Sequence, residues 1–211
     1  MALHIGSRPV WLICMPQSVT DAHKQSQDEQ QFMAKLSAYM HHQEEMRSPH
    51  VFVCTQQQAL DYATRLASAD ENILVNPALN PMDWGDYEGV RREEFEEKTS
   101  AKFFEDFVRD PISTRFPGGE CYGDFVRRLM PVVVEIEQKL EPVLVVAPIS
   151  VLQVLHCYFA QFPVQRASEI SVPRYAVMEW RRRGSGFAQR LIDESEIAAG
   201  SAESCQQTSE A

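Results

Sequence analysis

Short apolar runs alternate along this chain with longer segments whose apolar residues recur at helical spacing. The apolar runs occupy residues 10–14 (VWLIC), 50–54 (HVFVC) and 143–147 (VLVVA). A run that is apolar at nearly every position is typical of a strand buried on both faces, as in a parallel sheet. Helical spacing predicts helices over residues 28–42, 56–68, 120–140 and 150–160. Pro131 lies inside the third of these helices and is expected to kink or interrupt it.

The order of these segments predicts the fold class. Strands and helices in alternation favour right-handed crossovers, and therefore an α/β fold with three αβα layers and a mostly parallel central sheet. Residues 175–183 and 187–192 flank Gly184, Ser185 and Gly186, which predicts a hairpin at the edge of the sheet. We expect one domain over residues 1–192. Residues 193–211 form an acidic, polar tail without Lys or Arg, which is expected to be disordered unless another surface binds it.

Charge and cysteine content exclude several functions. The chain has 30 Asp and Glu against 20 Lys and Arg, a net charge of −10, which argues against binding of nucleic acid or anionic lipid. No apolar run approaches the roughly 18 residues of a membrane span, so we expect no membrane insertion. The five cysteines are scattered, without a C-x-x-C pair, as in a reduced compartment. We expect no cofactor, no metal and a cytoplasmic location, with a cytoskeletal or organellar assembly as an open alternative.

Two segments carry a resemblance to a known family. Residues 115–122 (RFPGGECY), followed by Phe125 and Arg128, resemble the R-[FY]-P-x-G-E-S-Y…R segment of the histidine phosphatase (phosphoglycerate mutase-like) superfamily. Residues 79–89 (LNPMDWGDYEG) resemble its L-x-E-x-D-x-G-x-[WY]-E-G segment. The likeness is greatest to the bisphosphatase domain of 6-phosphofructo-2-kinase/fructose-2,6-bisphosphatase. The resemblance implies a phosphoglycerate mutase-like fold.

The resemblance also implies which positions would carry the chemistry. In that family one His attacks phosphorus, a second His and two Arg stabilise the transferring group, and a Glu protonates the leaving oxygen. At the matching positions this chain has other residues: Met15 and Pro16, Gln58, Pro81 and Pro148. Proline has neither an ionisable side chain nor a backbone N–H. We therefore predict a pseudophosphatase that is not an enzyme and has no catalytic residues.

Function is then expected to lie in binding. We predict a structural or accessory subunit of a multi-protein assembly, with the tail 193–211 and the hairpin 175–192 as candidate docking surfaces. An alternative is a sensor that binds a sugar phosphate or another small anion near Arg115. Cys14 and Cys54 end two strands that we expect to be neighbours, and both are predicted to line that vestigial site. Two further alternatives are a residual fructose-2,6-bisphosphatase and an enzyme with a cysteine nucleophile.

Overall fold

The computed structural model describes residues 8–14, 22–67, 72–90 and 92–207 and centres on a six-stranded sheet. The strand order is β3-β2-β4-β1-β5-β6. The strands are β1 (Pro9–Cys14), β2 (His50–Val53), β3 (Ile73–Val75), β4 (Val143–Ala147), β5 (Val177–Arg183) and β6 (Gly186–Ile192). The β1–β4, β2–β4 and β2–β3 pairs are parallel, whereas the β1–β5 and β5–β6 pairs are antiparallel. The predicted α/β class and mostly parallel sheet are confirmed.

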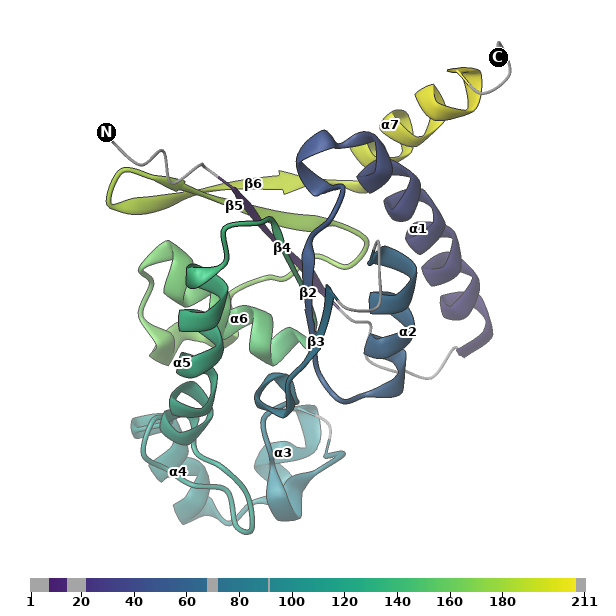
Figure 1. Ribbon diagram of the computed structural model, residues 1–211. Coiled ribbons are helices and arrows are strands. Elements are labelled where there is room, and N and C mark those ends of the chain that lie inside the picture. Colours follow the sequence, from purple (N-terminus) through teal and green to yellow (C-terminus); the bar gives the residue numbers. More distant parts are fainter. Residues whose placement is uncertain (1–7, 15–21, 68–71, 91, 208–211) are drawn as a thin grey trace.

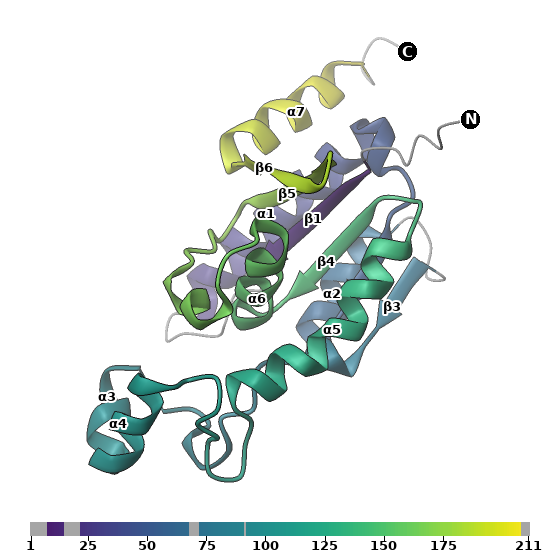
Figure 2. The same cartoon turned by 90° about the vertical axis from the view of Figure 1, so that its left-hand side faces the viewer.

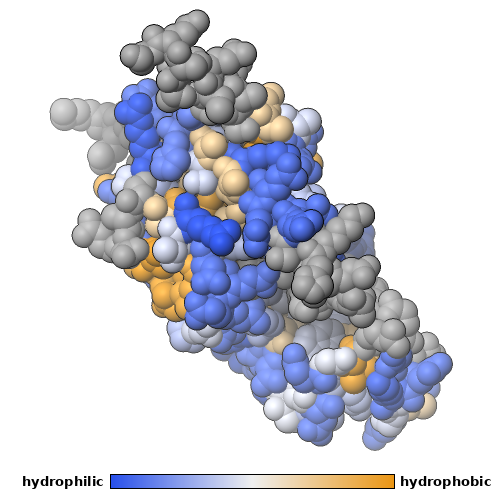
Figure 3. All heavy atoms as spheres, turned by 90° about the vertical axis from the view of Figure 1, so that its right-hand side faces the viewer, coloured by the Kyte–Doolittle hydropathy of each residue, from blue (hydrophilic) through white to orange (hydrophobic). Residues whose placement is uncertain are grey.

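Helices cover both faces of this sheet. Figures 1 and 2 show α1 and α2 on one face and α5 and α6 on the other. The longer helices are α1 (Ala22–His42), α2 (Gln57–Leu66), α5 (Tyr122–Gln138), α6 (Ile149–Ala160) and α7 (Glu194–Gln207). Every residue of β4 is buried, because this strand lies inside the sheet with helices on either side. The outward face of α1 and α2 is mostly hydrophilic in Figure 3, as expected for helices that direct their apolar side inward.

Helix α5 extends through Pro131 without interruption. Proline at this position cannot donate to the carbonyl group four residues earlier. Pro131 is exposed, so water can bind that carbonyl group from outside. Of the two predicted effects of Pro131, a kink or an interruption, the interruption is wrong. Phe125, Leu129 and Ile136, on the inward side of the helix, are buried on both sides of the proline.

The hairpin at the sheet edge is confirmed. Strands β5 and β6 pair in continuous register from Val177–Ile192 to Arg183–Gly186. Two residues, Gly184 and Ser185, form the turn, and Gly184 has a φ of 57°. Glycine is favoured there because a positive φ at the first central position of a tight hairpin turn strains other residues.

The C-terminal segment corrects the expectation of a disordered tail. Residues Glu194–Gln207 form α7, which packs along α1. Ile197 is fully buried, Lys35 pairs with Glu194 at 3.1 Å, and the Tyr39 hydroxyl donates to Glu196 at 3.1 Å. The surface that binds the described part of the tail thus belongs to this chain itself. The sequence pattern missed it because the tail alone carries too few apolar residues to indicate a buried face.

Two short helices, α3 (Arg92–Lys98) and α4 (Ala101–Arg109), lie beyond the end of the sheet. Figure 2 shows them apart from the sheet and its covering helices. Their aromatic rings pack on Phe116, which is fully buried. Among the described residues, no helix is both long and apolar enough to cross a membrane.

Gly200 allows close contact between α7 and α1. A Cβ at this position would lie 2.6 Å from the Tyr39 ring. We predict that Gly200→Ala destabilises the chain by about 1 kcal/mol, because overpacking outweighs the better helix propensity of alanine. A fall of about 2–4 °C in melting temperature is expected in calorimetry. Gly186→Ala, where a Cβ meets nothing within 4 Å, is the matched control. A Gly200→Ala variant as stable as the native chain would refute this packing.

Candidate functional site

The carboxyl ends of the parallel strands meet at one edge of the sheet, which is where open α/β folds bind ligands. Cys14, Cys54 and Pro148 lie at or directly after the ends of β1, β2 and β4. The prediction that the strands of Cys14 and Cys54 are neighbours is wrong, because β4 lies between β1 and β2. Two strand spacings, about 10 Å, therefore separate Cys14 from Cys54, which is too far for a disulfide.

Neither cysteine at this edge is an activated thiol. Burial raises the pKa of Cys14 to about 11, although the nearby charge of Arg174 acts in the opposite direction. Burial also raises the pKa of Cys54. A thiol attacks as its thiolate, so both cysteines are poor nucleophiles at neutral pH. The alternative of a cysteine nucleophile loses its support here.

Gln58, which occupies the position of an arginine in the family pattern, contacts an acid. Its side-chain amide donates to Glu29 of α1 at 3.2 Å, and the Tyr62 hydroxyl donates to the same carboxylate oxygen at 3.1 Å. Burial and the Glu29 charge raise the pKa of Tyr62. A carboxylate therefore stands beside this position, and its charge opposes the binding of a phosphate group there.

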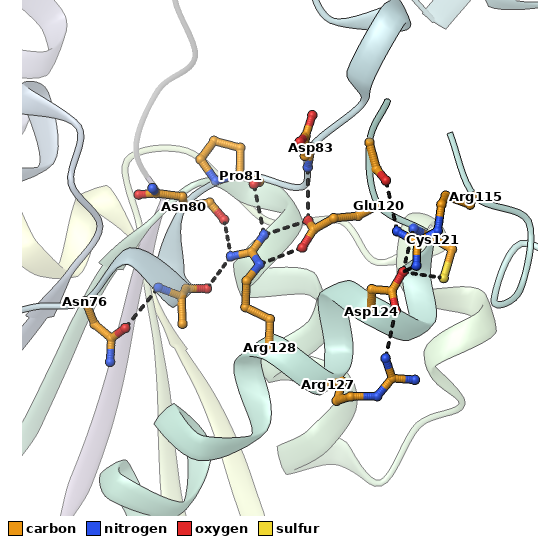
Figure 4. A network of polar contacts seen from close by, with 12 residues as sticks. Asn76, Asn80, Pro81, Asp83, Arg115, Glu120, Cys121, Asp124, Arg127 and Arg128 are labelled. Carbon is orange, nitrogen blue, oxygen red and sulfur yellow. Dashed lines mark hydrogen bonds and ion pairs between the residues drawn. The ribbon is translucent and has the colours of Figure 1, made fainter. Parts of the chain in front are cut away.

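Arg128 of α5 binds the loop that contains Pro81 (Figure 4). Its guanidinium group forms a two-pronged pair with the Glu120 carboxylate, with both N···O distances at 2.8 Å. It also donates to three carbonyl oxygens, those of Ala78 at 2.6 Å, Asn80 at 3.2 Å and Pro81 at 3.1 Å. Pro81, at the position of the family's general acid, thus contributes its backbone to the support of the loop.

Glu120 is held as a carboxylate by its neighbours. Burial alone would raise the pKa of Glu120, but hydrogen bonds from Arg128 and from the Asp83 amide, together with the Arg128 charge, outweigh it and lower the pKa. The Glu120 amide in turn donates to the Asp83 carbonyl oxygen at 2.9 Å. Residues 79–83 and 120–128 are therefore joined by charge-assisted and backbone hydrogen bonds.

The two segments that carry the family resemblance also interlock through their backbones. The Asp86 amide donates to the Pro117 carbonyl oxygen at 2.9 Å. A Cβ on Gly85, whose φ is 55°, would lie 2.0 Å from that oxygen, and a Cβ on Gly119 would lie 2.5 Å from the Asp83 carbonyl oxygen. Only glycine permits this approach at both positions. The Asn80 side chain extends the network to β2 by accepting from the Thr55 amide at 3.0 Å.

Arg115 lies on the other side of Glu120 from Pro81 in Figure 4. It forms an ion pair with Asp124 and donates to the Gly119 carbonyl oxygen at 3.0 Å. Asp124 also pairs with Arg127 at 2.7 Å and accepts from the Cys121 thiol at 3.1 Å. The sensor hypothesis expects the positive charge of Arg115 to bind an anionic ligand. In the structure this charge is paired with Asp124 in the first turn of α5.

The structure brings together only part of the predicted site. Cys14, Cys54 and Pro148 share the carboxyl edge of the sheet, whereas Arg115 belongs to the network at the start of α5. Met15 and Pro16 lie outside the described residues. Glu29 and Arg174 were missed by sequence reasoning, since each reaches the edge from an element distant in sequence and neither carries a motif. Within the described ranges, no group of three His, Cys, Asp or Glu side chains could hold a metal ion.

Residues 28–194 match the family model of the histidine phosphatase superfamily (branch 1), so the chain belongs to this superfamily. Among curated proteins, it is 32% identical over 113 residues to a 6-phosphofructo-2-kinase/fructose-2,6-bisphosphatase of Arabidopsis thaliana, covering 54% of this chain and 15% of the relative. It is 33% identical over 112 residues to a fructose-2,6-bisphosphatase of Saccharomyces cerevisiae, covering 52% and 24%. The matched region is thus less than a quarter of each relative's length.

Solved structures support the fold. An alpha-ribazole phosphatase from Shigella flexneri superposes with a TM-score of 0.63 at 16% identity, covering 88% of this chain and 96% of that one. A mycobacterial glucosyl-3-phosphoglycerate phosphatase superposes with a TM-score of 0.63 at 17% identity, covering 89% and 98%. Identities this low show the shared fold alone.

These comparisons contradict the prediction that the chain is a pseudophosphatase and not an enzyme. The superfamily to which it belongs, and the relatives at about one-third identity, are named for phosphatase activity. The prediction rested on the residue types at five positions, of which Met15 and Pro16 lie outside the described residues. The substituted residues at these positions cannot take the catalytic roles that the family assigns to them. That fact alone does not make the protein inactive.

The Arg128 network supplies a test of the site's architecture. Arg128→Lys keeps the charge but cannot reproduce the planar fork on Glu120 or all three carbonyl contacts. We expect it to lower the free energy of unfolding by about 1–3 kcal/mol in denaturant titration. Arg127→Lys is the matched control, because the Arg127 side chain is 78% exposed and its exposed pair with Asp124 contributes little. Equal stabilities of the two variants would contradict the assigned role.

The raised pKa of Cys14 predicts slow alkylation. With a thiol pKa of about 11, the thiolate fraction at neutral pH is at least about tenfold below that of an unfolded chain. Iodoacetamide labelling followed by peptide mass spectrometry should therefore show Cys14 reacting at least about tenfold more slowly in the native protein than in denaturant. Labelling of Cys14 at the unfolded rate or faster would show an activated thiol.

Proposed function

We propose that this member of the histidine phosphatase superfamily acts as an accessory subunit that binds other proteins in a larger assembly. The observation that carries the proposal is the extension of helix α7 beyond the end of α1 (Figure 1). The internal pairing of the motif's arginines argues against the alternative of an anion sensor. Arg115 is paired with Asp124 and Arg128 with Glu120, so both guanidinium groups stabilise the chain's own loops. An anionic ligand near Arg115 would meet the negative charge of the Asp124 carboxylate, which opposes its binding and argues against the sensor alternative.

The C-terminal helix favours binding of a protein partner. Helix α7 docks on α1 through its first half, around Ile197 and Gly200. Figure 1 shows the helix extending beyond the end of α1, away from the sheet. Short helices are only marginally stable in water by themselves. We therefore expect the turns of α7 beyond α1 to gain stability from a protein partner that packs on them.

Truncation after Gly200 tests this proposal. The shortened chain keeps the Lys35, Tyr39 and Ile197 contacts, so we expect an unchanged melting temperature. In affinity purification from native extract, the full chain should retain partners at fixed stoichiometry, and the truncated chain should retain them at least about tenfold less. Val108→Ala, at a residue of α4 that is 64% exposed and lies outside both candidate docking surfaces, is the control expected to retain them. No stoichiometric partner with the full chain would reject the proposal.

A second candidate is phosphatase activity toward a phosphorylated sugar, suggested by the names of the relatives at 32% and 33% identity. Arg174, whose charge acts on Cys14 at the carboxyl edge, is a cation that could attract a phosphate there. Phosphate release from fructose 2,6-bisphosphate that is lost in Arg174→Leu would support this candidate. Release no faster than a blank would remove it and leave the accessory role unaffected.

A further inference from the structure

The two edges of the sheet differ in length. Strand β3, at one edge, has three residues, whereas β6, at the other, has seven. In the described part of the chain, β6 pairs with β5 on one side only. Figure 1 shows β6 along the outer border of the molecule. A long edge strand presents unpaired N–H and C=O groups that can pair with another chain.

Strand β6 lacks the usual protection of such an edge. Its sequence, GFAQRLI, contains no proline, and its register with β5 is continuous, without a bulge. Residues 188–191 are exposed, and Leu191 is 50% exposed. Arg190 is the one charged residue of the strand, and it forms an ion pair with Glu196 of α7. Residues 188–191 of this edge are therefore exposed and together close to neutral.

The hairpin geometry determines which backbone groups point outward. The pair that closes the two-residue turn, Arg183 and Gly186, lies in a hydrogen-bonded position. Hydrogen-bonded and non-bonded positions alternate along an antiparallel pair. Phe187, Gln189 and Leu191 are therefore the residues whose N–H and C=O groups face away from β5.

We propose that β6 pairs antiparallel with β6 of a second copy of this chain, around a twofold axis at Gln189, so that two sheets join into one. In this register Gln189 faces Gln189 of the second copy, and Phe187 faces Leu191. All outward backbone groups of these three residues would be hydrogen-bonded. The pattern is self-complementary, as an isologous interface requires.

Side-chain positions favour the same register. Phe187 and Leu191 lie on the face of the hairpin that packs on α6, where Phe187 contacts Phe159 with ring centroids 4.9 Å apart. Pairing would place each exposed Leu191 against a Phe187 ring, an apolar cross-strand contact. On the opposite face Arg190 would face Ala188, so the two Arg190 side chains would not oppose each other. The inference does not depend on the proposed accessory role.

Sedimentation equilibrium of the full chain, at concentrations up to the millimolar range, tests the proposal. We expect a monomer–dimer equilibrium. Gln189→Pro removes an outward N–H group without removing a β5–β6 hydrogen bond, and it should weaken the dimer at least about tenfold. Leu191→Lys should weaken it similarly by removing the apolar contact. Val108→Lys, at a residue that is 64% exposed in α4, which Figure 2 shows apart from the sheet, is the matched control and should leave the dimer unchanged.

Cross-linking tests the register directly. Gln189→Cys places a thiol on the twofold axis, so mild oxidation should yield a covalent dimer beyond that of the native chain. Leu191→Cys faces Phe187 of the second copy and should not cross-link with itself. A monomeric native chain at all concentrations would overturn the proposal. A dimer that is insensitive to Gln189→Pro and Leu191→Lys would place the interface elsewhere and overturn it equally.

Discussion

The position of the Arg128 guanidinium group is the constraint on which the region beyond the sheet depends. One planar cation on α5 satisfies three carbonyl oxygens of the loop at residues 78–81 and the carboxylate of Glu120. Those carbonyls belong to a short 3-10 helix (Pro77–Leu79) and the loop after it and do not pair with a strand. Without Arg128 they would need water or another donor. Asn80 then transmits this anchoring to the end of β2 through Thr55. The loop, helix α5 and the sheet are thereby fixed relative to one another.

This constraint explains why two distant stretches carry the family resemblance. Residues 83–86 and 116–120 approach backbone to backbone, and the approach requires glycine at positions 85 and 119. Glu120 and Arg128 complete the contact with charge-assisted bonds. Each of these residue types follows from packing and hydrogen bonding, whatever reaction takes place at the carboxyl edge. The resemblance in these segments therefore identifies the fold more firmly than the chemistry.

Local patterns predicted most of the secondary structure but not the order of the strands. The apolar runs of β1, β2 and β4, the spacing in α5 and the glycines of the β5–β6 turn are visible in the sequence, because each depends on neighbours within one element. The separation of Cys14 from Cys54 depends on where β4 inserts, which no local pattern contains. The contact of Gln58 with Glu29 and the docking of α7 on α1 likewise join elements far apart in the chain.

The same distinction explains the error about enzymatic activity. Matching residues one at a time identifies which side chains cannot act in the family's way, and proline at positions 81 and 148 cannot transfer a proton. It does not identify groups that reach the edge from other elements. Arg174 is such a group: its charge acts on Cys14 at the end of β1, although no motif contains it. The charge of this edge is therefore a property of the assembled fold, in which Glu29 and Arg174 count as much as the aligned positions.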